Sequence, residues 1–208
     1  PHGLLNSGEP SHGSCNLLPQ GLRLSPQWQL QTGARLQTTP FMQYTFRKAT
    51  AADLGAIMDI IQEAKEQMHR EDKYQWDDTY PTHQHIEADL LAGNGYVMAH
   101  NGRPVAYGAV VFTGEPAYEK IEGHWLSEQP YVVLHRLAVS EAVKGHGVGM
   151  LVMQEVEQLA VAASIHSFKV DTNHDNTRML RVLDKMGFSY CGNITYPQGS
   201  RMAYEKLL

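Results

Sequence analysis

The sequence has few cysteines and no long hydrophobic segment. Its 208 residues include only two cysteines, Cys15 and Cys191, and their spacing fits neither a metal-ligand pair nor a disulfide framework. No run of about 18 apolar residues is present, so no transmembrane helix is expected. The N-terminus also lacks the charged and apolar segments of a signal peptide. These absences predict a soluble, cytoplasmic protein.

An excess of basic residues is also absent. Lys and Arg total 17 against 22 Asp and Glu, for a net charge of −5, whereas a nucleic-acid-binding domain is expected to be strongly basic. His83 and His85 are two positions apart on an expected helix, so they point in different directions and form no metal pair. The hydrophobic fraction of 42% is sufficient for a core. We therefore expect a globular protein without nucleic-acid, membrane or metal binding.

The composition changes near residue 42. Residues 1–41 carry only three charged side chains, Glu9, Arg23 and Arg35, and show no sustained hydrophobic period. We interpret this segment as a leader or as an extension foreign to the native chain, with Met42 as the expected native start. Residues 42–208 then form one domain.

Regular patterns begin after Met42. A capping-box pattern at Thr50–Asp53 precedes an apolar helix face, and Asn101-Gly102 is a strong hairpin signal. Apolar runs predict strands at 44–50, on both sides of 101–102, and at 130–139, 167–173, 188–194 and 200–206; helical periods predict helices at 54–68, 82–92, 148–163 and 179–186. This order predicts the α/β class, with a mixed central sheet of about six to seven strands flanked by helices.

Three glycines follow the strand that ends at Val139. Gly145, Gly147 and Gly149 alternate at the start of an expected helix, where the first amides have no partner within the helix and favour an anion. Glycines leave those amides accessible, and Lys144 adds a positive charge. The pattern therefore predicts a site for a phosphate-bearing cofactor.

Three interpretations of these glycines remain open from the pattern alone. The loop could be a flexible turn without a ligand. A dinucleotide site of an oxidoreductase would need a third glycine where Met150 stands, although Asp171 ends the following strand as that fold expects. The third interpretation is a diphosphate loop of the form Lys-Gly-x-Gly-x-Gly.

The diphosphate loop and its surroundings resemble the GNAT superfamily of N-acetyltransferases. The matching segments are "HRLAV", "KGHGVGMLVMQEVE" and "VDTNHDNTRMLRVLDKMGF", and the expected order of elements over 42–208 also fits. The resemblance implies an acetyl-CoA-dependent transferase in which the cofactor lies between two splayed parallel strands, here 131–139 and 167–173. Transfer would be direct, since no cysteine nucleophile is evident.

The resemblance also assigns residues to the cofactor. The pantetheine arm would pair with the backbone of Leu137, Ala138 and Val139, as an added strand does. Asn173 and Asn176 would lie close to the same arm. The pyrophosphate would bind amides of the loop formed by Lys144, Gly145, His146, Gly147, Val148 and Gly149.

Acetylation of an amine calls for a base, and His135 is the first candidate. Histidine side chains titrate near pH 6.5, and strand alternation predicts that His135 shares a face with Val133, Leu137 and Val139. Glu122 and His124 are weaker alternatives. The backbone amide of Leu137 is the expected oxyanion donor.

The general acid is not evident from the sequence. The family often has a tyrosine four residues before the glycine of Gly-Phe, but Leu183 stands there. Tyr190 and Tyr196 are the remaining candidates. The missing tyrosine leaves open a non-catalytic acyl-CoA-binding module as an alternative function.

The acceptor pocket is expected beside the segment "QWDDTYP". Gln75, Trp76 and Tyr80 would line it with Asp77, and Glu122 would reach it from the loop that also carries Tyr118 and Trp125. Burial of these aromatic rings in the core is an equal alternative. The expected acceptor is a primary amine of a small molecule or a peptide. Dimers are common in the family, so a homodimer is possible.

Overall fold

The computed structural model describes residues 43–73, 75–197 and 199–208. The predicted N-terminal extension and Met42 lie outside these residues. Helices α1 to α4 span Leu54–Arg70, His83–Leu91, Val148–Ala162 and Thr177–Met186. Short 3-10 helices η1 to η3 span Ala51–Asp53, Pro116–Lys120 and Glu141–Val143. Strands β1 to β8 span Tyr44–Lys48, Gly95–His100, Arg103–Val111, Glu122–Gly123, Val132–Val139, Ser167–Thr172, Ser189–Tyr196 and Gly199–Leu207.

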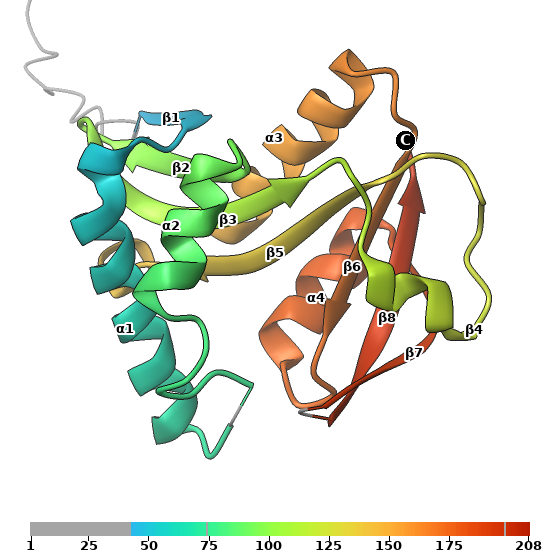
Figure 1. Cartoon of the computed structure of the whole chain (residues 1–208). Coiled ribbons are helices and arrows are strands. Elements are labelled where there is room, and N and C mark those ends of the chain that lie inside the picture. Colours follow the sequence, from blue (N-terminus) through green and yellow to red (C-terminus); the bar gives the residue numbers. More distant parts are fainter. Residues whose placement is uncertain (1–42, 74, 198) are drawn as a thin grey trace, which may run out of the picture. The chain divides into compact units, whose positions relative to one another are not determined.

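The described strands form one mixed sheet in the order β1-β2-β3-β5-β6-β8-β7-β4 (Figure 1). The predicted order of elements and the α/β class are confirmed, and every predicted helix is present. The sheet has one strand more than the upper prediction, because the excursion at 114–129 contains the two-residue strand β4, which pairs with β7.

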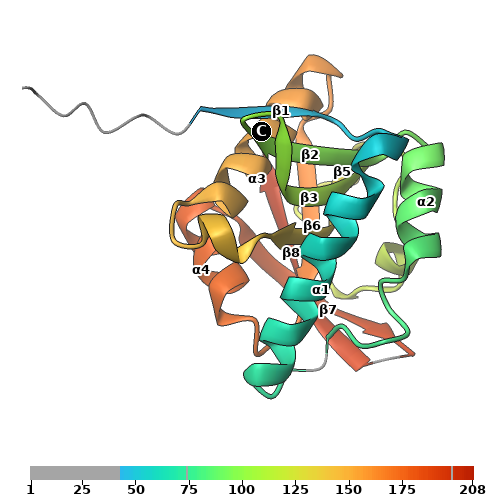
Figure 2. The ribbon, with the colours of Figure 1, turned by 90° about the vertical axis from the view of Figure 1, so that its left-hand side faces the viewer.

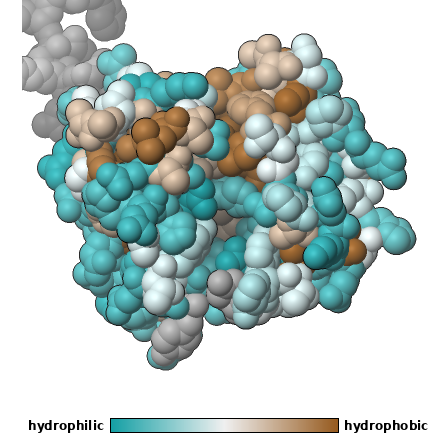
Figure 3. Space-filling view, viewed as in Figure 1, coloured by the Kyte–Doolittle hydropathy of each residue, from teal (hydrophilic) through white to brown (hydrophobic). Residues whose placement is uncertain are grey.

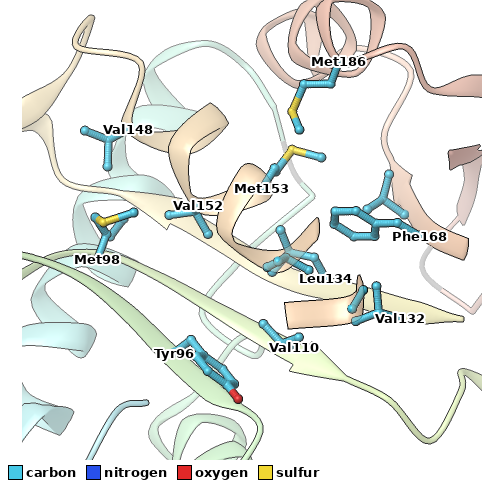
Figure 4. Close-up of a cluster of buried hydrophobic side chains, with 14 of the residues drawn as sticks. Tyr96, Met98, Val110, Val132, Leu134, Val148, Val152, Met153, Phe168 and Met186 are labelled. Carbon is cyan, nitrogen blue, oxygen red and sulfur yellow. The ribbon is translucent and has the colours of Figure 1, made fainter. Parts of the chain in front are cut away.

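Helices cover both faces of the sheet (Figure 2). The predicted apolar face of α1 packs with α2 against β2, β3 and β5 in one core cluster. On the opposite face, α3 and α4 cover a second cluster. Figure 4 shows Val152 and Met153 of α3 directed toward Leu134 of β5 and Phe168 of β6. The two cores hold β5 in the middle of the sheet.

Strands β5 and β6 separate soon after they begin. Their parallel pairing includes only Val132 with Phe168 and Val133 with Lys169, although β5 continues to Val139 and β6 to Thr172. Figure 1 shows the two strands diverging from this shared end. The predicted splay is therefore confirmed, and it leaves one edge of β5 without a β6 partner beyond Val133.

A bulge in β5 changes the predicted alternation of side chains. Arg136 has a φ of +54°, and the register with β3 shifts where Tyr107 pairs with Ala138 and Ala109 with His135. The extra residue reverses the phase of the strand. Leu137 and Val139 consequently pack in the α3 core, while Val133 lies on the opposite face. The prediction that His135 shares one face with Leu137 and Val139 is therefore wrong.

Candidate active site

Residues 144–149, which follow η3 and include the first two residues of α3, present unpaired backbone amides. Buried Val143 and Val148 anchor the two ends of this segment, and Gly145 and Gly147 have φ values of +82° and +74°, which only glycine adopts without strain. Among the described residues, the N–H groups of Gly145, Gly147, Val148 and Gly149 have no hydrogen-bond partner. We call residues 144–149 the glycine loop.

No side chain obstructs these amides. A Cβ atom added at Gly145 or Gly147 would meet nothing within 4 Å, and one at Gly149 would touch only Val139. His146 is exposed. The side chain of Lys144 is about half exposed, and its ammonium lies 3.6 Å from a carboxylate oxygen of Glu141. The glycine loop is therefore open, with a cation at its rim, as an anion site requires.

A cleft of about 200 Å³ adjoins the glycine loop between α1 and α4. It is lined by β5 and by residues of both helices, including Leu137, Ala138, Val139, Gly149 and Asn176. We call it the α1–α4 cleft. Its β5 wall is the strand whose β6-facing edge is unpaired, so an extended ligand can lie along that edge.

Asn176 caps α4 at the wall of this cleft. Its Oδ1 atom accepts a hydrogen bond of 3.2 Å from the amide of Met179, and its Nδ2 atom donates to Thr172 at 3.1 Å. One N–H of its side-chain amide remains for a ligand. Asn173 precedes this turn and is partly exposed, but it does not line the cleft.

A second cavity, of about 360 Å³, lies on the α2 side of β5. We call it the polar cavity. Its walls are Gln75, Asp77, Thr79, Tyr80, Asp89, Asn94, Val111, Glu115, His135, Arg136, Tyr196 and Arg201. A smaller space of about 50 Å³, the passage, lies between the cavity and the cleft. Gln75 lines all three spaces, and Leu137 and Asn176 border both the passage and the cleft.

His135 lies where the polar cavity meets the passage. Its Nε2 atom is 3.1 Å from Oε2 of Glu115. The hydrogen bond from His135 lowers the pKa of the Glu115 carboxyl below its usual value, against the opposing effect of burial. Glu115 is held in turn by the amide of Ala117, which donates to its Oε1 atom. His135 is thus fixed beside a carboxylate at the opening of the passage.

Arg136 is occupied by a buried network. It donates two hydrogen bonds to Asp89, of 2.8 and 2.5 Å, and a third of 3.0 Å to the hydroxyl of Tyr80. Tyr107 also donates to Asp89, at 2.6 Å. Burial, followed by the charge of Asp89, raises the pKa of Tyr107 far above its usual value. The network fixes the bulge of β5 and ties it to α2.

Asp171 of β6 forms a second network. Tyr118 and Tyr196 both donate to its Oδ1 atom, at 2.8 and 3.3 Å, and Arg201 donates to Oδ2 at 3.1 Å. Burial, followed by the charge of Asp171, raises the pKa of Tyr196 well above its usual value. The guanidinium of Arg201 also stacks over the Tyr196 ring at 4.5 Å.

The structure brings many of the predicted acceptor residues together. Gln75 and Tyr80 line the polar cavity with Asp77. Trp76 is buried in the α1 core and reaches the passage. In contrast, Glu122 lies exposed on β4, where it accepts from Thr195, and it lines none of the three spaces. The structure therefore does not support Glu122 as a site residue.

The candidate acids are not placed to act. Tyr190 is half exposed, stacks on the edge of Tyr204 and lines none of the three spaces. Tyr196 lines the polar cavity, but its hydroxyl donates to Asp171. Leu183 is fully buried in the α3 core. Tyr118 and Trp125 pack in a small third core cluster, so the packing alternative holds for them.

Four charged residues of the site were not predicted. Glu115, Asp89, Arg136 and Arg201 come from a loop, a helix and two strands, and no short motif joins them. Only Arg136 stood inside a matched segment, "HRLAV". The left-handed backbone conformation of Arg136 could not be predicted from the sequence, because arginine rarely adopts a positive φ.

The described part of the chain contains neither a helix suited in length and apolarity to crossing a bilayer nor a cluster of three His, Cys, Asp or Glu residues arranged for a metal ion. Cys191 is a buried free thiol, and burial raises its pKa. It belongs to neither network described above.

Solved structures share this fold. A GNAT-family acetyltransferase from Streptococcus agalactiae is 31% identical with a TM-score of 0.72, over 79% of this chain and 95% of that one. One from Listeria monocytogenes is 20% identical with a TM-score of 0.65, over 79% and 95%. A Salmonella typhimurium protein with its cofactor acetyl-CoA is 17% identical with a TM-score of 0.59, over 80% and 94%.

No curated protein matches the chain by sequence. The model of the acetyltransferase (GNAT) family matches residues 56–188, which include the glycine loop, both splayed strands and the cap of α4. This match covers well over half of the chain. The chain therefore belongs to the GNAT family of acetyltransferases.

Proposed function

We propose that this protein transfers an acetyl group from acetyl-CoA directly to a primary amine of a small molecule. The observation that carries the proposal is the arrangement of three connected spaces at the splay. The α1–α4 cleft adjoins the glycine loop, the polar cavity lies on the α2 side of β5, and the passage shares lining residues with both. Two substrates can therefore reach the point where β5 and β6 part from two different spaces.

The chain's residues fit acetyl-CoA. The unpaired amides of the glycine loop and the charge of Lys144 suit a pyrophosphate, and no Cβ atom fills the space above Gly145 and Gly147. Leu137, Ala138 and Val139 would hold the pantetheine arm along the free edge of β5, beside Asn176. Asn173 would lie near the same arm. When bound, acetyl-CoA supplies the acetyl group as a reactive thioester.

His135 is proposed as the base that takes the proton of the acceptor amine. An alkyl amine with a pKa of about 10.4 is almost fully protonated near neutral pH, so a base contributes on the order of 10²–10⁴ in rate. Because the carboxylate of Glu115 can only accept, Nε2 of neutral His135 carries the hydrogen and Nδ1 remains to accept a proton. Leu137 borders the passage, and its backbone amide is the proposed oxyanion donor.

A tyrosine acid is not part of the proposal. Leu183 is enclosed in the core, Tyr190 is away from the passage, and the proton of Tyr196 is directed to Asp171. A raised pKa also makes Tyr196 a poorer proton donor. We expect coenzyme A to leave as its thiolate, which no tyrosine of the site protonates.

The size of the polar cavity favours a small acceptor. A volume of about 360 Å³ is at the lower end of the range for small-molecule sites. It would also admit one terminal residue of a peptide. We also propose a cytoplasmic location, on the basis of the sequence features described above.

Release of free thiol from acetyl-CoA over a panel of amines tests the function. Substitution His135→Ala should abolish most turnover while calorimetry shows unchanged acetyl-CoA binding. His83→Ala is the matched control, because His83 is exposed at the start of α2 and lines none of the three spaces. No thiol release by the wild type with any amine, or binding of NAD(H) without binding of coenzyme A, would overturn the proposal.

A further inference from the structure

The polar cavity contains several charged groups, and most of them are already paired. Glu115 faces His135, and Asp89 receives two hydrogen bonds from Arg136. Oδ1 of Asp77 accepts from both the amide and the hydroxyl of Thr79. Among the cations of this cavity, Arg136 has its guanidinium directed to Asp89 and Tyr80. It therefore has little capacity left for a substrate.

Arg201 differs from Arg136 in this respect. Its side chain is 16% exposed and lines both the polar cavity and the passage. Only its Nη1 atom donates within the described part of the chain, to Asp171, so the N–H groups of Nε and Nη2 have no partner there. Stacking on the Tyr196 ring holds the guanidinium plane. A fixed guanidinium with free donors is suited to a carboxylate.

The negative charge of Asp171 does not prevent Arg201 from binding an anion. Its side chain is only 2% exposed, and its oxygens accept from Tyr118, Tyr196 and Arg201. Asp171 also borders the passage, but both of its carboxylate oxygens are occupied by these three donors. Its effect is to fix the position of the guanidinium.

We propose that the acceptor is a free amino acid or a close analogue, whose anionic group binds Arg201 while its amine lies beside His135. The proposal rests on the proposed acetyl transfer and names its substrate class. His135 and Arg201 both border the small passage, so the amine and the anion have to be only a few atoms apart. The polar cavity then receives the side chain, and all its lining residues except Val111 carry a polar group.

The surface agrees with a small polar substrate. Figure 3 shows the face hollowed between the α1–α2 side and the β6–β8 side, with largely hydrophilic residues on both sides of the hollow and hydrophobic residues above it. Gln75, Thr79 and Asn94 supply uncharged donors and acceptors within the cavity. A purely cationic acceptor such as a polyamine would leave the free donors of Arg201 unpaired on binding, which is unfavourable.

The test compares each amino acid with its carboxamide in the thiol-release assay, with an aminophosphonate as a third arm. The carboxamide keeps the amine and removes the anion. We expect the wild type to prefer the free acid by about 100-fold in kcat/KM, because the amide lacks the negative charge and replaces one of the two acceptor oxygens by a donor that faces the donors of Arg201. A preference for the aminophosphonate over the amino acid would show that the anionic group bound by Arg201 is a phosphonate of an amino-acid analogue.

Substitution Arg201→Gln should reduce this preference to nearly one, by lowering kcat/KM for the free acid. Arg103→Gln is the matched control, since Arg103 is exposed at the start of β3 and lines none of the three spaces. If Arg201→Gln does not fold, the preference of the wild type decides by itself. Equal or faster acetylation of the carboxamides would overturn the inference alone, whereas no acetylation of any amine would overturn the proposed function as well.

Discussion

The Nε2 atom of His135 lies 3.1 Å from Oε2 of Glu115, although the two residues come from β5 and from the loop after β3. The pKa of the Glu115 carboxyl lies below its usual value because His135 donates a hydrogen bond to it, so this carboxylate stays charged throughout the neutral range. A base that is oriented by a third group is a common arrangement in enzymes. We therefore assign Glu115 a positioning role.

Substitution Glu115→Gln tests that role. The amide has nearly the same size but lacks the charge that orients the imidazole, so we expect kcat to fall on the order of 10- to 100-fold. The KM for acetyl-CoA and the melting temperature should change little, because the substitution is distant from the glycine loop. Steady-state kinetics and a thermal melt measure these quantities. Glu122→Gln, on exposed β4, should leave kcat unchanged, and an equal loss in both variants would refute the assignment.

The glycine loop allows a matched pair of substitutions. Gly147 and Gly187 have similar φ values, +74° and +78°, and an added Cβ at either position meets nothing within 4 Å. Alanine at either site should therefore cost about 1–2 kcal/mol of folding free energy through backbone strain alone. Only Gly147→Ala should also weaken coenzyme A binding, because its methyl group occupies the space above the unpaired amides.

Urea denaturation and calorimetry with coenzyme A separate the two effects. We expect similar losses of stability in the two variants and a loss of affinity of about 10-fold in Gly147→Ala only. This loss corresponds to about 1.4 kcal/mol. Unchanged affinity in Gly147→Ala would show that the ligand does not approach these amides.

The elements of this fold could be predicted because each has a local signal. The capping box at Thr50 and Asp53 is formed as expected, the hairpin turns at Asn101 and Gly102 with positive φ at both, and Gly187 ends α4 in the left-handed conformation. The position of the glycine loop followed in the same way, since it depends on residues that are adjacent in the sequence.

The charged part of the site has no such local signal, and it could not be predicted. Glu115 meets His135, and Arg201 meets Asp171, only after distant strands have come together. The bulge at Arg136 also reversed the faces of Leu137 and Val139, and it is maintained by contacts to Asp89 and Tyr80 rather than by a turn signal. Tertiary hydrogen bonds, and not local propensity, determine this part of the molecule.

Asp89 should contribute strongly to stability. Its carboxylate is almost buried and neutralises Arg136, which is also nearly buried. Asp89→Asn leaves the guanidinium without a counterion, and removing one partner of a buried ion pair costs about 3–5 kcal/mol. Chemical denaturation at neutral pH measures this loss. Asp59→Asn, exposed on α1, should change stability by less than about 0.5 kcal/mol, and a comparably small effect at Asp89 would contradict the role given to the network.

The ion pair at the start of α1 should make stability depend on pH. Asp53 accepts hydrogen bonds of 2.8 Å from both Nη atoms of Arg47 and one from the amide of Thr50. The hydrogen bond from Arg47, with those from Thr50, holds the pKa of the Asp53 carboxyl far below its usual value. In the unfolded chain an aspartate titrates near pH 3.9. The stabilisation by Asp53 is therefore complete above that pH and is lost as the pH falls toward the lower pKa of the folded state.

Asp53→Asn should accordingly be less stable than the wild type by about 1–2 kcal/mol near neutral pH, since it loses the charge of the capping box and of the ion pair. The difference should shrink when urea unfolding is repeated at about pH 3, because the carboxylate is then partly protonated in the unfolded wild type and the linked stabilisation declines. Asp59→Asn, exposed on α1, should show no such convergence. A stability gap for Asp53→Asn that is the same at both pH values would mean that the charge of Asp53 does not stabilise the fold, and that its contribution comes from hydrogen bonds that asparagine also makes.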